Sequence, residues 1–177
     1  MSGHNKWSQI KHQKGTTDAK RSQIFSKLGK IISLTAKKGE NPDFNPELRA
    51  AIEKAKKENM PSDNIERAIK RGAGKLEGVQ LESVCFEAYG PGGAAIIIEG
   101  ITDNKNRTVA EIKHTLAKNN GKFVASGSVL WAFEHIDGKW TPKHTIELNE
   151  NDTGALNKIF EELDNHDDIQ NIYTNAL

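Results

Sequence analysis

Apolar residues in the first part of the chain recur every three or four positions, which is the spacing of one face of an α-helix. Between residues 18 and 38 this stripe comprises Ile24, Phe25, Leu28, Ile31 and Ile32. Thr16 or Thr17 can cap the start of this helix, and Gly39 can end it. The pattern predicts an amphipathic helix with one apolar face.

Two more helices are predicted from their start signals. Asn45 followed by Pro46 is typical of an N-cap and a first helical position, because proline has no N–H to lose there. Asp63 and Glu66 have the spacing of a capping box at a third helix start. We therefore expect residues 1–78 to form a basic helical domain with an N-terminal arm.

After residue 78 the apolar period changes from about 3.6 to 2, which predicts strands. Residues 84–89 alternate, and the run at 94–101 contains three consecutive isoleucines, as expected for a strand covered on both faces. Two helices are predicted in the rest of the chain, one that begins at a Thr108–Glu111 capping box and one at 152–163. Strands are predicted at 129–133, 145–148 and 169–173, and Asp137-Gly138 predicts a hairpin turn. The fold class is α+β, with residues 79–177 forming a mixed sheet that has helices on one face.

The formal net charge of +1 conceals opposite charges in the two halves of the chain. Residues 1–75 contain 17 Lys and Arg against 8 Asp and Glu, whereas residues 76–177 contain 8 against 16. This asymmetry is typical of a nucleic-acid-binding half joined to another domain. Two halves that attract each other, within one chain or between copies, would give the same counts, so the oligomeric state is left open. The acidic half could also meet a basic protein partner.

The basic half offers a candidate surface for a polyanion. Its first fourteen residues place lysines among histidines and a tryptophan, and the following helix carries lysines beside its apolar stripe. Lysine attracts phosphates, while Trp and His can stack on bases. The predicted nucleic-acid-binding residues are Lys6, Trp7, Lys11, His12, Lys14, Lys20, Arg21, Lys27, Lys30 and Lys37. The alternative is an arm that packs on its own domain, with Trp7 and Ile10 as anchors.

A secondary anion or partner site is predicted at Asn104, Lys105 and Arg107, because this polar loop leads into the N-terminus of a helix. Capping of that helix by side chains of the loop is the alternative. The glycine-rich segment at 90–93 lacks the lysine of a P-loop and is interpreted as a tight turn.

Other candidate chemistry is weak. Cys85 is the only cysteine, which excludes an internal disulfide and a multi-cysteine zinc site, and it has no motif around it. The six histidines show no metal-binding spacing, so no metal or other cofactor is expected. Asp164, Asp167 and Asp168 are interpreted as a solvated acidic turn. No acid, base and nucleophile come together, and the chain is predicted to be no enzyme. Neither a signal peptide nor a membrane-length apolar segment is found, and we expect a cytoplasmic protein without membrane contact.

A series of short motifs resembles the YebC/PmpR family from the first residues to the last. They are Gly3-His4-Asn5-Lys6-Trp7, Ile10-Lys11-His12, Asp18-Ala19-Lys20-Arg21, Ile24-Phe25, Asn59-Met60-Pro61, Asp63-Asn64-Ile65-Glu66-Arg67-Ala68-Ile69, Tyr89-Gly90-Pro91-Gly92-Gly93, Thr102-Asp103-Asn104-Lys105-Asn106-Arg107-Thr108 and Asp167-Asp168-Ile169-Gln170-Asn171-Ile172-Tyr173 with Asn175. Each motif is weak singly, and their order is highly specific.

The resemblance implies a helical N-terminal domain, α/β domains after it, and a role in gene expression without catalysis. Members are described as DNA-binding transcriptional regulators, and others as translational activators that work with the ribosome. This chain resembles a short member, because the hairpin near Asp137 stands where most members have an inserted α/β domain. We therefore predict a DNA-binding transcriptional regulator, with a ribosome-associated, rRNA-binding translational activator as the alternative.

Overall fold

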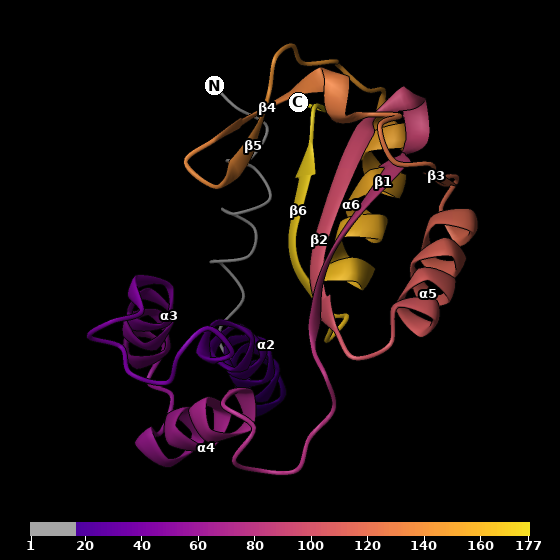
Figure 1. Ribbon diagram of the computed structural model, residues 1–177. Helices are drawn as coiled ribbons and strands as arrows, with labels where there is room; N and C mark the ends of the chain where they lie inside the picture. The colour runs from indigo at the N-terminus through magenta and orange to yellow at the C-terminus, as the bar shows by residue number, and fades with distance from the viewer. Residues whose placement is uncertain (1–16) are drawn as a thin grey trace. The chain divides into compact units, whose positions relative to one another are not determined.

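The computed structural model describes residues 17–177, which form two compact units (Figure 1). The helical unit comprises residues 17–83 and 101–104. The sheet unit comprises residues 84–100 and 105–177. One strand, β2 (Ala95–Thr102), belongs to both units: residues 95–100 are part of the sheet unit and residues 101–102 are part of the helical unit.

The three predicted helices of the helical unit are confirmed as α2 (Asp18–Ala36), α3 (Pro46–Lys57) and α4 (Ser62–Gly72). The Thr17 side chain caps α2, and the Asn45 side chain accepts a hydrogen bond from the Leu48 N–H at the start of α3. The predicted capping box at Asp63 is wrong. Pro61 occupies the N-cap of α4, and no side-chain oxygen caps that helix.

The core of the helical unit is built from the predicted stripes of its helices. Ile32, Leu48 and Ala55 are completely buried there. The Ser33 hydroxyl, also buried, donates a hydrogen bond of 2.9 Å to the carbonyl oxygen of Ala68 on α4. This bond requires α2 and α4 to approach closely, and glycine at the end of α4 permits it.

Gly29→Ala and Gly72→Ala should change the stability of the helical unit in opposite directions. A Cβ at Gly29 would meet only the Met60 methyl group, 3.9 Å away. Alanine there should raise the free energy of unfolding by up to about 1 kcal/mol through helix propensity. A Cβ at Gly72 would overlap the Ser33 carbonyl, a backbone group that cannot rotate away. A loss of about 1–3 kcal/mol is expected. Urea unfolding followed by circular dichroism measures both changes, and equal midpoints for the two variants would contradict the close approach.

The sheet unit confirms the α+β class. Its four-stranded sheet has the order β3-β1-β2-β6. The strands are β1 (Glu82–Tyr89), β2 (Ala95–Thr102), β3 (Lys122–Val124) and β6 (Ile169–Thr174). β1 with β3 and β2 with β6 pair antiparallel, and the one parallel contact found in the described residues is a bridge between Ile146 and Ala176. The strand predicted at 145–148 is reduced to that bridge, and β3 was not predicted.

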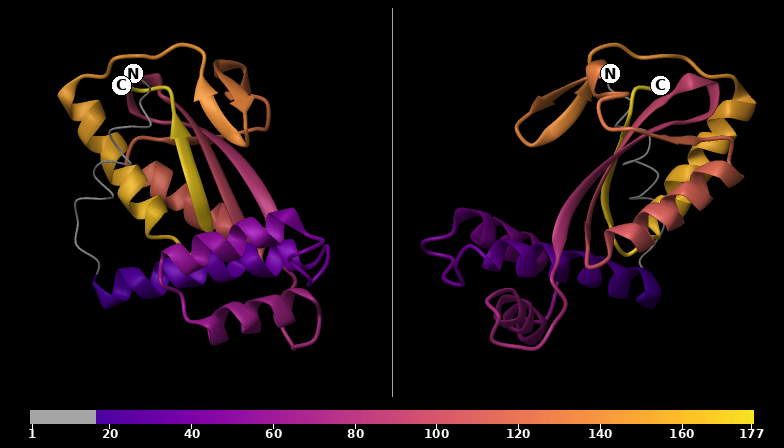
Figure 2. Two further views of the ribbon diagram at one scale, coloured as in Figure 1. Left: turned by 90° about the vertical axis from the view of Figure 1, so that its left-hand side faces the viewer. Right: turned by 45° about the vertical axis from the view of Figure 1, so that its right-hand side comes forward.

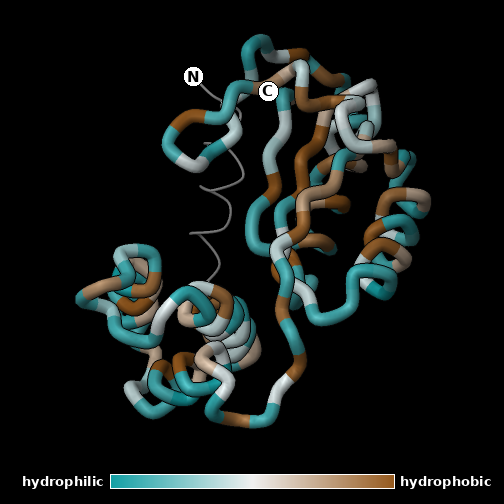
Figure 3. Tube along the Cα trace, viewed as in Figure 1, coloured by the Kyte–Doolittle hydropathy of each residue, from teal (hydrophilic) through white to brown (hydrophobic). Residues whose placement is uncertain are grey.

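Two helices cover one face of this sheet, α5 (Lys105–Lys118) and α6 (Glu150–Asp164) (Figure 2). Ile96 and Ile98 of β2 pack in this helical layer, and Ile97 points to the opposite face. All three side chains are fully buried, and β2 is apolar along most of its length (Figure 3). The prediction of a strand covered on both faces is confirmed.

The opposite face is covered by a short 3₁₀ helix, η2 (Leu130–Ala132), and by the hairpin of β4 (Phe133–Ile136) and β5 (Lys139–Pro142). The hairpin turn at Asp137 and Gly138 is confirmed, since both residues have positive φ. The strand predicted at 129–133 is wrong, because this segment forms η2. Val129 and Phe133 are both buried, as they would be in a strand. The alternation of apolar residues could therefore not distinguish η2 from a strand.

The glycine-rich segment after β1 is a tight turn, as predicted. Gly92 and Gly93 have φ of 66° and 80°, values that favour glycine. The Gly90 N–H donates to the Ala94 carbonyl and closes the turn.

Candidate nucleic-acid interface

Three lysines of α2 and the lysine at its C-cap form what we call the basic sector: Lys20, Lys27, Lys30 and Lys37. At 3.6 residues per turn they fall within a sector of about 100° beside the apolar stripe. The first three are half-buried and Lys37 is exposed. Lysine is suited to contacts with phosphates, which its ammonium group attracts as a point charge.

The other predicted contact residues are placed differently. Arg21 lies about 100° around the helix from Lys20, on the side of the apolar stripe, and its guanidinium is 3.8 Å from the Asp18 carboxylate. Lys37 donates a hydrogen bond of 2.6 Å to the Leu81 carbonyl oxygen. The predicted arm residues Lys6, Trp7, Lys11, His12 and Lys14 lie outside the described residues.

The predicted secondary site at the start of α5 contains an internal ion pair. The Arg107 guanidinium lies 2.8 Å from the carboxylate of Asp168, whose residue is only 2% exposed. Thr108 donates its hydroxyl proton to the same carboxylate oxygen at 2.7 Å. Two interpretations are corrected by this geometry: Thr108 lies inside α5 and does not cap it, and Asp168 is a buried partner, not part of a solvated turn.

At this site the Thr102 hydroxyl accepts a hydrogen bond from the Asn104 N–H, which stabilises the turn that leads into α5. Lys105 begins α5 and is exposed. Because Arg107 is engaged by Asp168, any anion bound here would have to compete with a buried carboxylate for that guanidinium. An anion-binding role for Asn104 and Lys105 stays a prediction.

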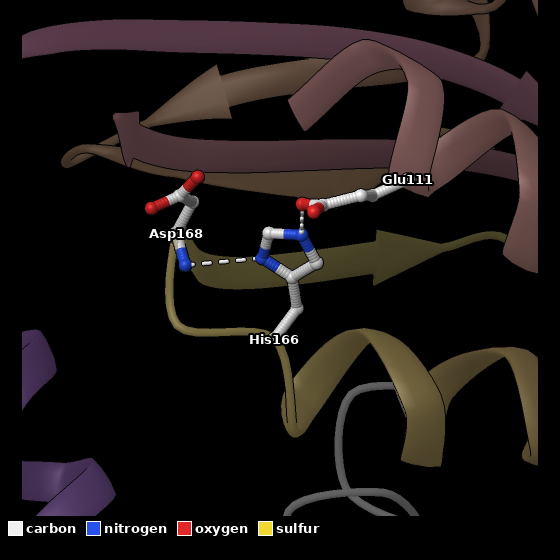
Figure 4. Close-up of side chains that lie close together, drawn as sticks. All are labelled: Glu111, His166 and Asp168. Atoms are coloured by element: carbon white, nitrogen blue, oxygen red, sulfur yellow. Dashed lines mark hydrogen bonds and ion pairs between the residues drawn. The ribbon is translucent and has the colours of Figure 1, made fainter. Parts of the chain in front are cut away.

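Sequence spacing also missed a cluster of Glu111, His166 and Asp168, whose ligand atoms lie within 4.8 Å of one another (Figure 4). His166 Nδ1 accepts a hydrogen bond from the Asp168 N–H at 3.1 Å, and Nε2 lies 2.7 Å from a Glu111 oxygen. Because Nδ1 accepts a hydrogen bond, a neutral His166 imidazole carries its proton on Nε2. A metal that bound at Nε2 would therefore have to displace this proton. The arrangement is a hydrogen-bonded network that holds the start of β6 against α5.

A second network lies on the opposite face of the sheet, around the half-buried Glu99. Its carboxylate accepts hydrogen bonds from the Trp140 indole at 2.9 Å, the Asn171 amide at 3.2 Å and the Tyr173 hydroxyl at 3.3 Å. Burial and the Glu99 charge raise the pKa of Tyr173. Burial, Glu99 and Glu87 likewise raise the pKa of the Cys85 thiol. A thiol with a raised pKa is mostly protonated at neutral pH, which opposes a role as nucleophile.

None of the helices among residues 17–177 has the length and apolar character needed to cross a membrane. Carboxylates dominate the buried polar networks of the sheet unit, whereas the basic sector belongs to the helical unit. The lysines of the basic sector thus belong to a different unit from the buried Asp168 that pairs with Arg107.

Family models match nearly the whole chain. The model described as the TACO1/YebC protein N-terminal domain matches residues 5–75, and that described as the TACO1/YebC second and third domain matches residues 81–138 and 135–176. The two segments of the second match meet at the β4–β5 hairpin.

Proteins named "probable transcriptional regulatory protein" are similar to this chain. One from Halothermothrix orenii is 48% identical over 182 residues, covering 98% of this chain and 70% of that protein. One from Desulfosudis oleivorans is 59% identical over 135 residues, covering 76% of this chain and 55% of that protein. The chain thus spans little more than half the length of some relatives that it matches.

A relative from Solibacter usitatus is 38% identical over 235 aligned positions, which cover 99% of this chain. Because 235 exceeds the 177 residues of this chain by 58, at least 58 of those positions have no counterpart here. Together with the break at the hairpin, this confirms a short member that lacks an inserted segment. The crystal structure of Aq1575, a conserved hypothetical protein from Aquifex aeolicus, has a TM-score of 0.88 and 34% identity, covering 97% of this chain and 96% of that one.

Proposed function

This chain belongs to the TACO1/YebC family, and we propose that it is a non-enzymatic regulator of gene expression that binds DNA through the basic sector of α2 and the arm before it. The observation that carries the proposal is the concentration of charge in the N-terminal match. Residues 1–75 hold 17 Lys and Arg against 8 Asp and Glu, and four of these lysines lie on one side of α2 and its C-cap. Phosphate contacts should dominate the affinity, because lysine offers attraction without base-reading geometry.

The same character of the basic sector supports a second candidate, a translational activator bound to ribosomal RNA. All four side chains of the sector are lysines, which pair with any phosphate as point charges and lack the planar fork of arginine. Cosedimentation of the protein with ribosomes, run beside a DNA mobility shift at the same salt concentration, separates the two candidates.

The variant Lys20→Gln/Lys27→Gln/Lys30→Gln should bind nucleic acid more weakly than the parent, and to a similar degree for all sequences. Glutamine keeps helix propensity and much of the aliphatic stem. Each lost phosphate contact should reduce the slope of log K against log salt by about 0.9, so a reduction approaching 3 is expected. Fluorescence anisotropy with labelled duplex DNA and structured RNA, at several salt concentrations, measures both effects.

The matched control is Lys54→Gln/Lys56→Gln/Lys57→Gln on α3, which removes the same charge from exposed positions. If net charge alone controls binding, both variants will weaken it equally. Binding by the α2 variant that is as tight as binding by the parent, with an unchanged salt slope, would rule out the basic sector as the contact surface.

A further inference from the structure

The loop of residues 125–131, before and within η2, is held in place by a buried carboxylate. Glu87 projects from β1 onto the face opposite the helices and is only 3% exposed. It accepts backbone N–H bonds from Gly127 at 2.6 Å, Val129 at 2.6 Å and Leu130 at 3.2 Å. Burying a carboxylate is costly unless such donors satisfy it, and together they fix the backbone of this loop.

The loop has a second anchor at Ser128. Its carbonyl oxygen accepts hydrogen bonds from the Tyr89 hydroxyl at 3.0 Å and from the Trp131 indole N–H at 2.8 Å. The Ser128 hydroxyl donates to the Ala125 carbonyl oxygen at 2.6 Å. The Trp131 side chain is therefore fixed to this loop. Its indole N–H, the only donor of the ring, is already bonded to Ser128.

Trp131 nevertheless remains 57% exposed as a residue. The His144 imidazole stacks on it, with ring centroids 5.5 Å apart and an interplanar angle of 30°. A hydrogen bond of 2.9 Å from the Lys143 N–H to the Ala132 carbonyl oxygen ties the segment that carries His144 to η2. His144 thus lies over one side of the Trp131 ring and helps to hold it in place, and we call this stacked pair the stacking platform (Trp131 and His144).

A lysine lies beside this platform. Lys143 precedes His144, and its backbone N–H bonds to the Ala132 carbonyl oxygen, next to Trp131 in the chain; Lys143 is exposed. The segment 133–147 as a whole holds three acids (Glu134, Asp137 and Glu147) against two lysines, so Lys143 is the cationic residue that the contacts place at the platform. An aromatic face whose indole donor is satisfied, with a lysine beside it, matches the chemistry of a nucleobase attached to its phosphate. A protein partner that buried an apolar patch would gain little from a cation at this position.

We propose that the stacking platform binds an unpaired nucleobase, as a second nucleic-acid contact on the sheet unit. This inference rests on the proposed function and adds to it that part of the target is single-stranded or has a base displaced from its stack. Stacking on Trp131 releases no counterions, so the loss of this ring should lower the affinity without changing the salt dependence.

The test uses the full chain, a labelled short oligothymidylate and oligouridylate strand, and a labelled blunt-ended duplex. Trp131→Leu should weaken single-strand binding by at least about fivefold, with the salt slope and the duplex affinity unchanged. Trp131→Phe should retain most of the affinity, because phenylalanine still offers a stacking face. Ile136→Ala, at a site 51% exposed on the same hairpin, is the matched control and should bind like the parent.

The outcomes separate this inference from the function it rests on. Failure of the parent to bind any of the probes overturns both. Single-strand binding by Trp131→Leu that is as tight as in the parent, while the parent binds the probes, overturns the platform alone. Equal weakening in Ile136→Ala would indicate a general apolar surface of the kind a protein partner covers. If Trp131→Phe weakens single-strand binding as much as Trp131→Leu does, the loss comes from the missing hydrogen bond between the indole N–H and Ser128. Each of these two results also overturns base stacking.

Discussion

Arg107→Ala should lower the free energy of unfolding by about 3 kcal/mol, and Asp168→Ala should cost less. The reason is that the two partners are buried to different degrees. The Asp168 side chain is 3% exposed and the Arg107 side chain 44%. Removing the arginine leaves a buried carboxylate without its counter-charge, which is strongly destabilising. Removing the aspartate leaves a guanidinium that water can reach and takes away one acceptor of the Thr108 hydroxyl.

Urea unfolding of both single variants and of the double variant measures the two costs and the coupling between the residues. The double variant should be less destabilised than the sum of the singles, by about 0.5–3 kcal/mol. Additive costs, or a larger cost for Asp168→Ala, would show that the pair does not stabilise the fold in this way. If anions stabilise the parent and not Arg107→Ala, the predicted anion site at the start of α5 is supported despite the internal pair.

Glu87→Ala should destabilise the sheet unit by about 2–4 kcal/mol, because it leaves three backbone N–H groups without their acceptor. Val129, one of the three donors, is completely buried and has no access to water. Glu87→Gln keeps one acceptor oxygen but places an amide N–H₂ among N–H donors, so it should also be destabilising. Unfolding followed by tryptophan fluorescence in a Trp7→Phe background reports on this unit, since Trp131 and Trp140 both belong to it.

Glu82→Ala provides the matched control for Glu87→Ala, because Glu82 lies on the same strand and is exposed. Its effect should stay within about 0.5 kcal/mol. If both variants unfold at the same urea concentration, the carboxylate does not hold the loop. Glu87→Ala should also weaken single-strand binding if the rigid loop positions the stacking platform.

Features set by local interactions could be predicted from the sequence. The starts of α2 and α3 depend on side chains that bond to backbone groups three residues away, as Thr17 and Asn45 do. The hairpin turn at Asp137 and Gly138 depends on two consecutive residues that tolerate positive φ. The same local reasoning was wrong at Thr108. The spacing of Thr108 and Glu111 matches a capping box, but the Thr108 hydroxyl donates to the Asp168 carboxylate, sixty positions away.

For the candidate interface, the sequence placed lysines on one side of α2, and the structure added a contact of one of them, Lys37. It showed that Lys37 already donates to the Leu81 carbonyl oxygen. This contact does not follow from helical periodicity, because periodicity gives the angle of a residue around one helix and not its neighbours in other segments.

The sequence by itself determined the helices, the change from helical to strand periodicity, the charge of each half and, through its ordered motifs, the family. These are properties of neighbouring residues or of simple sums. Only the tertiary structure decided the roles of Glu87, Glu99 and Asp168, three carboxylates that sequence patterns treat as surface charges. Each is satisfied by donors that lie at least forty positions away. Whether a charge is solvated or buried depends on which distant segment packs against it, and one-dimensional spacing does not contain that information.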